Sequence, residues 1–295
     1  MKNIFRGLGV ALVTPFDEGG NVDYSSLERI LVRLLESRAD FLCVLGSTAE
    51  TACLSEGEQA GIKEFVCSHV GGRIPILLGM GSNNTQALVE RVHSFNLQGV
   101  DGLLSVSPFY NKPSQEGIYR HFKALSDATD KPIVIYNVPS RTGSNITAPT
   151  ALRLAEECPN VVALKEASGN MPQIEQILRE KPTEFDVLSG DDSITAKLIG
   201  MGAVGVISVI GNALPKEFGE LVHSALQGDA PRARTIDEAL SPFYQLLSRD
   251  GNPAGIKALL SGMGLCHEVL RLPLLPAGSS TKAELMEVLA HLHDR

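Results

Sequence analysis

Short, continuous apolar segments recur along this chain and alternate with stretches of helical periodicity. Eight such segments span residues 8–16, 40–46, 75–80, 102–108, 132–139, 161–168, 185–192 and 203–210. Their length and their many β-branched residues are typical of strands that a parallel sheet buries on both faces. Between them, residues 24–38 and 85–99 place apolar side chains at positions i, i+3, i+4 and i+7, which predicts amphipathic helices.

The number of these units predicts how the sheet is closed. Eight strands alternating with helices suit a (β/α)8 TIM barrel, and 295 residues suit such a barrel with an added segment. A doubly wound open sheet is the structural alternative. After residue 211 the apolar strands stop, and residues 216–228, 234–248, 252–264 and 281–293 carry helical patterns. We therefore expect an α/β fold with a catalytic barrel over residues 1–224 and a C-terminal helical bundle over residues 225–295.

Composition and charge argue against several classes of function. No stretch reaches the roughly 18 uninterrupted apolar residues that a membrane span requires. The early apolar run ends in Thr14-Pro15 without the small-residue cleavage site of a secretory signal. The net charge is −8 without a cluster of lysine and arginine, so we expect neither a nucleic-acid nor a membrane partner. Five cysteines without C-x-x-C spacing favour free thiols in the cytoplasm.

Polar residues close several of the predicted strands, and the carboxyl ends of the strands are where a barrel builds its active site. Lys165 is the strongest candidate for a catalytic residue among them. It follows the apolar run 161–164 in a strand that a barrel would bury, where lysine is rare unless something requires it. Burial disfavours the ammonium form and leaves a neutral amine able to attack a carbonyl carbon. The alternative is a lysine that reaches solvent or pairs with Glu166.

The other strand-end candidates suit covalent chemistry at such an amine. Tyr136 ends the preceding strand, where its phenol could pass a proton to or from Schiff-base intermediates through Thr48. Arg141 lies just beyond, and its planar guanidinium suits bidentate capture of a substrate carboxylate. Taken singly, Tyr136 could be a rim tyrosine, Ser47 and Thr48 helix caps, and Arg141 half of a surface ion pair.

The sequence gives no support for a metal or a nucleotide cofactor. No histidine occupies a strand end, and the adjacent acids Asp191 and Asp192 are weak ligands on their own, so we expect no metal. Residues 200–205 fit the pattern G-x-G-x-x-G, but they follow a helical stretch and lead into a strand. A dinucleotide-binding loop has the reverse order, so this match is rejected.

These motifs together resemble the dihydrodipicolinate synthase and N-acetylneuraminate lyase family of pyruvate-dependent class I aldolases. The resemblance covers essentially the whole chain and is carried by GVALVTPF, GSTAE, SPFYNKPSQEGIYRHF, YNVPSRTG, ALKEASG, LSGDD and GVISV. Ala49 stands where the family usually has glycine. The resemblance implies a TIM barrel and no cofactor, because the substrate pyruvate itself forms the covalent imine.

The resemblance also implies roles for individual residues. Lys165 would form the imine, Tyr136 and Thr48 would move protons, and Tyr110 would complete this relay from a neighbouring subunit. The protein would then be an oligomer, either a homodimer or a homotetramer built as a dimer of dimers.

Further implied roles concern the substrates. Ser47 and Thr48 would hold the pyruvate carboxylate, with main-chain groups of Gly190 and Ile207 nearby. Arg141 resembles the arginine that binds the carboxylate of L-aspartate 4-semialdehyde, so we expect condensation of pyruvate with this aldehyde, on the route to diaminopimelate and lysine. The alternatives are a lyase that releases pyruvate from N-acetylneuraminate or a 2-keto-3-deoxy sugar acid, and a non-catalytic barrel that senses pyruvate-like ligands.

Some relatives bind inhibitory lysine at a subunit interface through histidines, a glutamate and a tyrosine. The matching positions here are Glu56, Gln59, Ala87 and Phe109. Loss of a carboxylate and a phenol removes charge-assisted hydrogen bonds to a cation. We expect lysine to inhibit weakly or not at all, and a sub-millimolar inhibition constant in a steady-state assay would refute this.

Overall fold

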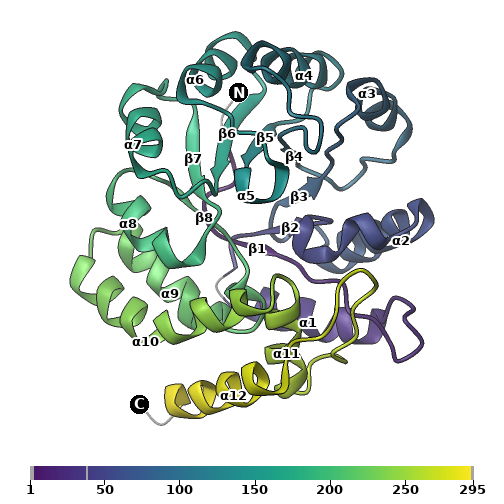
Figure 1. Cartoon of the computed structure of the whole chain (residues 1–295), viewed down its shortest axis with the longest axis vertical. Helices are drawn as coiled ribbons and strands as arrows, with labels where there is room; N and C mark the ends of the chain where they lie inside the picture. The colour runs from purple at the N-terminus through teal and green to yellow at the C-terminus, as the bar shows by residue number, and fades with distance from the viewer. Residues whose placement is uncertain (1–2, 38, 294–295) are drawn as a thin grey trace.

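The strands of the computed structural model, which describes residues 3–37 and 39–293, close into a parallel barrel. The strands are β1 Gly7–Ala11, β2 Phe41–Val44, β3 Ile76–Gly79, β4 Gly102–Val106, β5 Ile133–Asn137, β6 Val161–Glu166, β7 Asp186–Ser189 and β8 Gly205–Ser208. Each strand pairs with its sequence neighbours, and β8 returns to β1 (Figure 1). Each of the eight predicted apolar segments overlaps one strand, and β1 begins one residue before its segment. The barrel is therefore confirmed and the open sheet is wrong.

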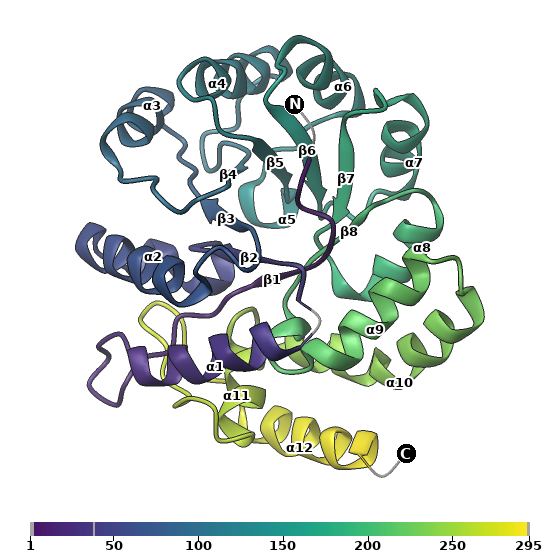
Figure 2. The same ribbon diagram turned by 180° about the vertical axis from the view of Figure 1, so that it is seen from behind.

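Helices surround the barrel and extend it on one side. They are α1 Tyr24–Glu36, α2 Glu56–Val70, α3 Thr85–Ser94, α4 Gln115–Asp127, α5 Pro139–Thr142, α6 Ala148–Glu157, α7 Met171–Glu180, α8 Thr195–Gly200, α9 Pro215–Leu226, α10 Ala230–Arg249, α11 Ala254–Gly262 and α12 Ser279–His293. Figures 1 and 2 show α10, α11 and α12 gathered beside α9 and α1. The C-terminal helical segment is thus present, and the predicted division between residues 224 and 225 falls within α9.

None of the helices in the described part of the chain combines the length and the apolar character needed to cross a bilayer. All five cysteines are free thiols. Residues 200–205, which match the dinucleotide pattern, run from the end of α8 into β8. The predicted helix-to-strand order is confirmed, and it is the reverse of the order in a dinucleotide-binding loop.

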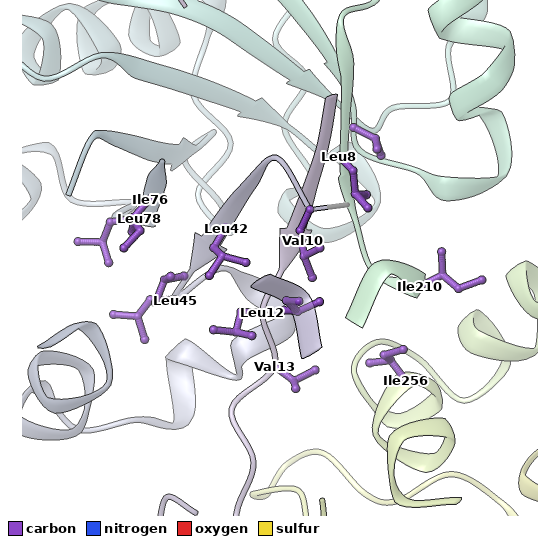
Figure 3. Close-up of a cluster of buried hydrophobic side chains, with 14 of the residues drawn as sticks. Leu8, Val10, Leu12, Val13, Leu42, Leu45, Ile76, Leu78, Ile210 and Ile256 are labelled. Atoms are coloured by element: carbon purple, nitrogen blue, oxygen red, sulfur yellow. The ribbon is translucent and has the colours of Figure 1, made fainter. Parts of the chain in front are cut away.

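The buried apolar side chains form two main layers around the strands. Outward-facing residues such as Leu42 and Val44 pack against the helices, and Figure 3 shows part of this outer layer. Inward-facing residues such as Phe41 and Cys43 fill the barrel. Successive residues of β2 therefore alternate between the two layers, as the pleat of a strand requires.

Strand β6 breaks this alternation with one additional inward residue. Ile133 pairs with Val161, but its successor on β5 pairs with Ala163, so the register shifts by one at Val162. Val162 and Ala163 both belong to the inner layer, whereas Leu164 returns to the outer one. A shift of one residue reverses the direction of every side chain after it. Because of this bulge, Lys165 points into the barrel and not toward the helices.

Candidate active site

The predicted strand-end residues meet at two adjoining cavities at the carboxyl end of the barrel. The cavities have volumes of about 460 and 740 Å³. The side chains common to both are those of Ser47, Thr48, Tyr136, Val138, Arg141 and Lys165. Residues from strands β5 and β6 and from the turns after β2 and β5 thus surround one space, which is large enough for small organic acids.

Lys165 lines both cavities with only 6% of its surface exposed. Its register partner on β5 is Tyr136, and the Lys165 Nζ lies 4.4 Å from the centroid of the Tyr136 ring. Within residues 3–37 and 39–293, no carboxylate lies within ion-pair distance of Lys165. The amine is therefore presented to the cavity and is not held as half of a salt bridge.

Glu166, the alternative partner of Lys165, points away from the cavity. Its carboxylate accepts hydrogen bonds from the Ser168 backbone N–H at 2.6 Å and from the Asn137 side-chain amide at 3.1 Å. Burial raises the pKa of Glu166, and these hydrogen bonds partly oppose that effect. The expected alternative of a Lys165–Glu166 pair is therefore wrong.

The floor beneath Lys165 is apolar. It is formed by inward-facing side chains that include Ala11, Cys43 and Leu104. Burial raises the pKa of the Cys43 thiol to about 11, although the nearby Lys165 lowers it. The thiol is neutral at physiological pH, so it supplies no counter-ion for the lysine.

Gly190, at the end of β7, leaves room for the lysine side chain. A Cβ atom at this position would lie 3.1 Å from Lys165 Cε and 2.8 Å from Ala167 Cβ. Both separations are tighter than ordinary van der Waals contact. The absence of a side chain at Gly190 thus lets Lys165 extend along the cavity wall.

The backbone around the site is strained at three residues. Leu45, Glu50 and Tyr110 have φ angles of 57°, 55° and 71°, values that side chains other than glycine rarely adopt. Leu45 and Glu50 flank the 3-10 turn Ser47–Ala49, which carries Thr48 into the cavity. Strain of about 1–3 kcal/mol per residue persists only where surrounding contacts enforce it. The turn is therefore held in place by its neighbours.

The remaining predicted residues divide into those at the cavities and those away from them. Arg141 lines both cavities from α5, and its side chain is exposed to solvent. Tyr110 is 85% exposed and lines neither cavity of its own chain, although Phe109 beside it lines the smaller one. Ile207 on β8 is 1% exposed, lies in the inner layer and lines neither cavity.

The two aspartates after β7 serve the backbone. Asp192 Oδ2 accepts hydrogen bonds from the N–H groups of Val209 at 3.0 Å and Ile210 at 2.8 Å, and so fixes the turn after β8. Asp191 accepts from the Ser193 N–H at 2.9 Å. The described residues contain no group of three side chains suited to a metal ion.

The larger cavity is completed by residues that the sequence did not indicate. Asp237, Tyr244 and Ser248 of α10 line it, and the Tyr244 hydroxyl donates to Asp237 at 2.8 Å. Asn252 joins them from the segment between α10 and α11. None of these residues follows a strand, so the strand-end criterion could not find them.

Two of the four positions matched to a lysine site lie at the smaller cavity. Gln59 and Phe109 line this cavity, and the Arg91 side chain donates to Gln59 Oε1. Glu56 and Ala87 lie in the first turns of α2 and α3. An arginine at this wall would repel a bound cation, in keeping with the weak lysine inhibition that the sequence predicts.

Known proteins resemble the chain over almost its full length. The model of the "Dihydrodipicolinate synthetase family" matches residues 4–292. A 4-hydroxy-tetrahydrodipicolinate synthase from Phocaeicola vulgatus is 53% identical, with 97% of each chain covered, and one from Porphyromonas gingivalis is 48% identical, with 98% covered. The solved structure of a dihydrodipicolinate synthase from Thermotoga maritima is similar with a TM-score of 0.96, at 39% identity and 99% coverage of each chain.

Proposed function

The chain belongs to the dihydrodipicolinate synthetase family, and we propose that its Lys165 site condenses pyruvate with L-aspartate 4-semialdehyde to 4-hydroxy-tetrahydrodipicolinate. This lyase-type reaction supplies diaminopimelate and lysine biosynthesis. The observation that carries the site assignment is the buried Lys165, turned into the barrel beside Tyr136 and free of an ion pair within the described residues.

The first half of the reaction activates pyruvate. The Lys165 Nζ adds to the C2 carbonyl carbon, and loss of water leaves a protonated imine. This cation withdraws electrons from C3, so a C3 proton is lost and an enamine forms. The electron sink is the substrate's own iminium, and for this reason we propose that no cofactor takes part.

The second half joins the two substrates. The enamine C3 attacks the aldehyde carbon of the semialdehyde, and the resulting alkoxide takes up a proton. The amino group of the product then adds to C2 and displaces Lys165, which closes the ring and regenerates the free amine. Addition, dehydration and ring closure each move a proton, and we assign these transfers to the hydroxyl groups of Tyr136 and Thr48, which share the cavities with Lys165.

The carboxylates of the two substrates are bound at different places in this proposal. The turn Ser47–Ala49 offers backbone N–H groups and the Ser47 hydroxyl to the pyruvate carboxylate, with Gly190 and the deeper Ile207 lending main-chain groups. Arg141, at the rim of both cavities, binds the carboxylate of the semialdehyde. This arrangement places the C2 carbonyl carbon of pyruvate next to Lys165 and the aldehyde group of the semialdehyde toward the opening of the cavity.

We also propose that the relay is completed between subunits of a homodimer or a homotetramer. Tyr110 is 85% exposed, has a strained backbone and lies outside the cavities of its own chain. A second copy would bury this side chain and bring its hydroxyl to the neighbouring site. The five free thiols support a cytoplasmic location.

An assay with purified protein tests this function. Pyruvate and aspartate semialdehyde are supplied together, and the cyclic product is detected by coupling to its reduction. Parallel reactions offer pyruvate with N-acetylmannosamine or with sugar-derived aldehydes. We expect turnover with the semialdehyde at least about a hundredfold faster than with any sugar; turnover of a sugar alone would assign the chain to the sugar-acid lyases.

Replacing Arg141 with methionine should weaken use of the aldehyde without affecting capture of pyruvate. A hydrogen bond to a charged group contributes about 1.5–3 kcal/mol, so we expect kcat/KM for the semialdehyde to fall roughly tenfold to a hundredfold. Borohydride trapping of the pyruvate imine should proceed at the wild-type rate. Steady-state kinetics and intact mass spectrometry measure the two effects.

The matched control is Arg153→Met on α6, where the guanidinium binds the exposed carboxylates of Glu116 and Glu157 far from the cavities. It should retain full activity. Unchanged kinetics in Arg141→Met would exclude the carboxylate role of Arg141.

A further inference from the structure

A hydrogen bond joins the proton relay to the C-terminal segment. The Asn252 Nδ2 donates to Thr48 Oγ1 at 2.9 Å, across 204 positions of sequence. For the described residues, this is the single hydrogen bond of the Thr48 side chain. We propose that Asn252 is a positioning residue, which orients the Thr48 hydroxyl so that its proton points into the cavity; this proposal rests on the function given above.

The chemistry of the two groups gives the direction of this effect. A threonine hydroxyl has one hydrogen to donate and two lone pairs to accept with. When Asn252 donates, it occupies a lone pair and leaves the hydrogen free for Tyr136 or a substrate atom. An acceptor at the same place would instead draw the hydrogen out of the cavity.

The surroundings of the amide group favour the donating orientation. Asn252 Oδ1 is buried and has no hydrogen-bond partner in the described chain. The reversed amide would place the NH2 group there, with both hydrogens unpaired. Unpaired buried donors are rarer in proteins than unpaired carbonyl oxygens. The amide therefore faces Thr48 with its nitrogen.

A buried ion pair holds the same two segments together a few residues away. Glu50, two residues after Thr48, pairs with Lys257 at 2.5 Å, and neither side chain is exposed. Lys257 also donates to the Val269 carbonyl at 2.8 Å, and the Arg271 backbone N–H donates to Glu50 at 3.0 Å. These contacts account for the strained backbone of Glu50 and fix Thr48 relative to α11.

Apolar packing fixes α11 from its other side. Ile256 is fully buried with Ile210, Leu12 and Val13 of the barrel rim, as Figure 3 shows. At Gly255 the helix approaches α10 so closely that a Cβ atom would lie 2.5 Å from a backbone oxygen of that helix. Asn252, two residues before the start of α11, is thus held at a defined distance from the catalytic turn.

Two variants of Asn252 test the proposal, with pyruvate and aspartate semialdehyde as substrates. In Asn252→Ala the hydroxyl loses its fixed orientation, and in Asn252→Asp a carboxylate of the same shape accepts the Thr48 hydrogen. We expect kcat to fall about tenfold in the alanine variant, the equivalent of one hydrogen bond, and at least as far in the aspartate variant. The KM for pyruvate should change less than threefold. Wild-type kcat in Asn252→Asp would overturn the donating orientation.

A double-mutant cycle shows whether Asn252 acts through Thr48. Thr48→Val alone should lower kcat about a hundredfold. Adding Asn252→Ala to it should lower kcat by less than a further twofold, because no hydroxyl remains to be oriented. Multiplication of the two single effects would overturn the proposal.

A control separates positioning from general weakening of the fold. Asn160→Asp alters a buried amide at the amino end of β6, which donates to the carbonyls of Ser126 and Thr129 at 3.1 and 2.7 Å. It should keep kcat per folded protein within twofold, and a tenfold loss there would overturn the positioning role. If the wild-type protein itself fails to convert the semialdehyde, the proposed function is wrong, whereas full activity in Asn252→Ala removes only the role of Asn252.

Discussion

Replacing Lys165 with alanine is expected to abolish turnover and covalent capture of pyruvate together. Loss of a covalent nucleophile lowers kcat by about 10⁴-fold or more in other enzymes. Borohydride reduction with pyruvate should add one substrate-derived group to the wild-type chain, on the peptide that contains Lys165, and nothing to the variant. Intact mass spectrometry, peptide mapping and the coupled assay measure these effects.

Two further variants sharpen this test. Lys165→Arg keeps a positive charge in the cavity, but a guanidinium does not act as an amine nucleophile, so it should be as inactive as the alanine variant. Lys131→Ala removes an amine that donates to the Val100 carbonyl at 2.7 Å, and should be fully active. Turnover in either Lys165 variant, or an adduct on another lysine, would place the nucleophile elsewhere.

Replacing Tyr136 with phenylalanine is expected to have the second-largest effect. The ring stays beneath the amine, where the Lys165 Nζ lies 4.4 Å from its centroid, so the change removes the hydroxyl alone. Loss of a general acid–base group lowers kcat by about 10²–10⁴-fold. The imine should still form, since Lys165 is intact, but more slowly. Time-resolved borohydride trapping separates the rate of imine formation from its final extent.

The matched control is Tyr119→Phe on α4, whose hydroxyl donates to Glu157 at 2.5 Å outside the cavities. This variant should retain its activity. If Tyr136→Phe traps pyruvate and turns over as fast as the wild type, the hydroxyl has no part in proton transfer.

The barrel and the centre of its site could be predicted because both leave strong local signals. Strands buried on both faces appear as continuous apolar runs, and a lysine at the end of such a run stands out by its charge. Lys165 and Tyr136 end neighbouring strands, so their proximity follows from the order of the strands in a closed barrel.

Other features left no such signal. Residues 161–164 are apolar on both faces, so the sequence does not show which of them point inward, and the bulge at Val162 stays hidden. Asn252 reaches Thr48 only through the packing of α11, which no local pattern encodes. Tyr110 was indicated by the family resemblance, and its outward position depends on the path of the loop and on a positive φ.

Because of the bulge in β6, the side of the barrel wall to which Lys165 points depends on whether the number of residues before it is odd or even. Exchanging Val162 for another apolar residue preserves the count of residues before Lys165 and hence the side of the wall on which the amine emerges. Losing or gaining one residue there would transfer the amine to the space between the barrel and its helices, with the chemical composition of the strand almost unaltered. The identity of the apolar residues in this strand can therefore vary more freely than their number.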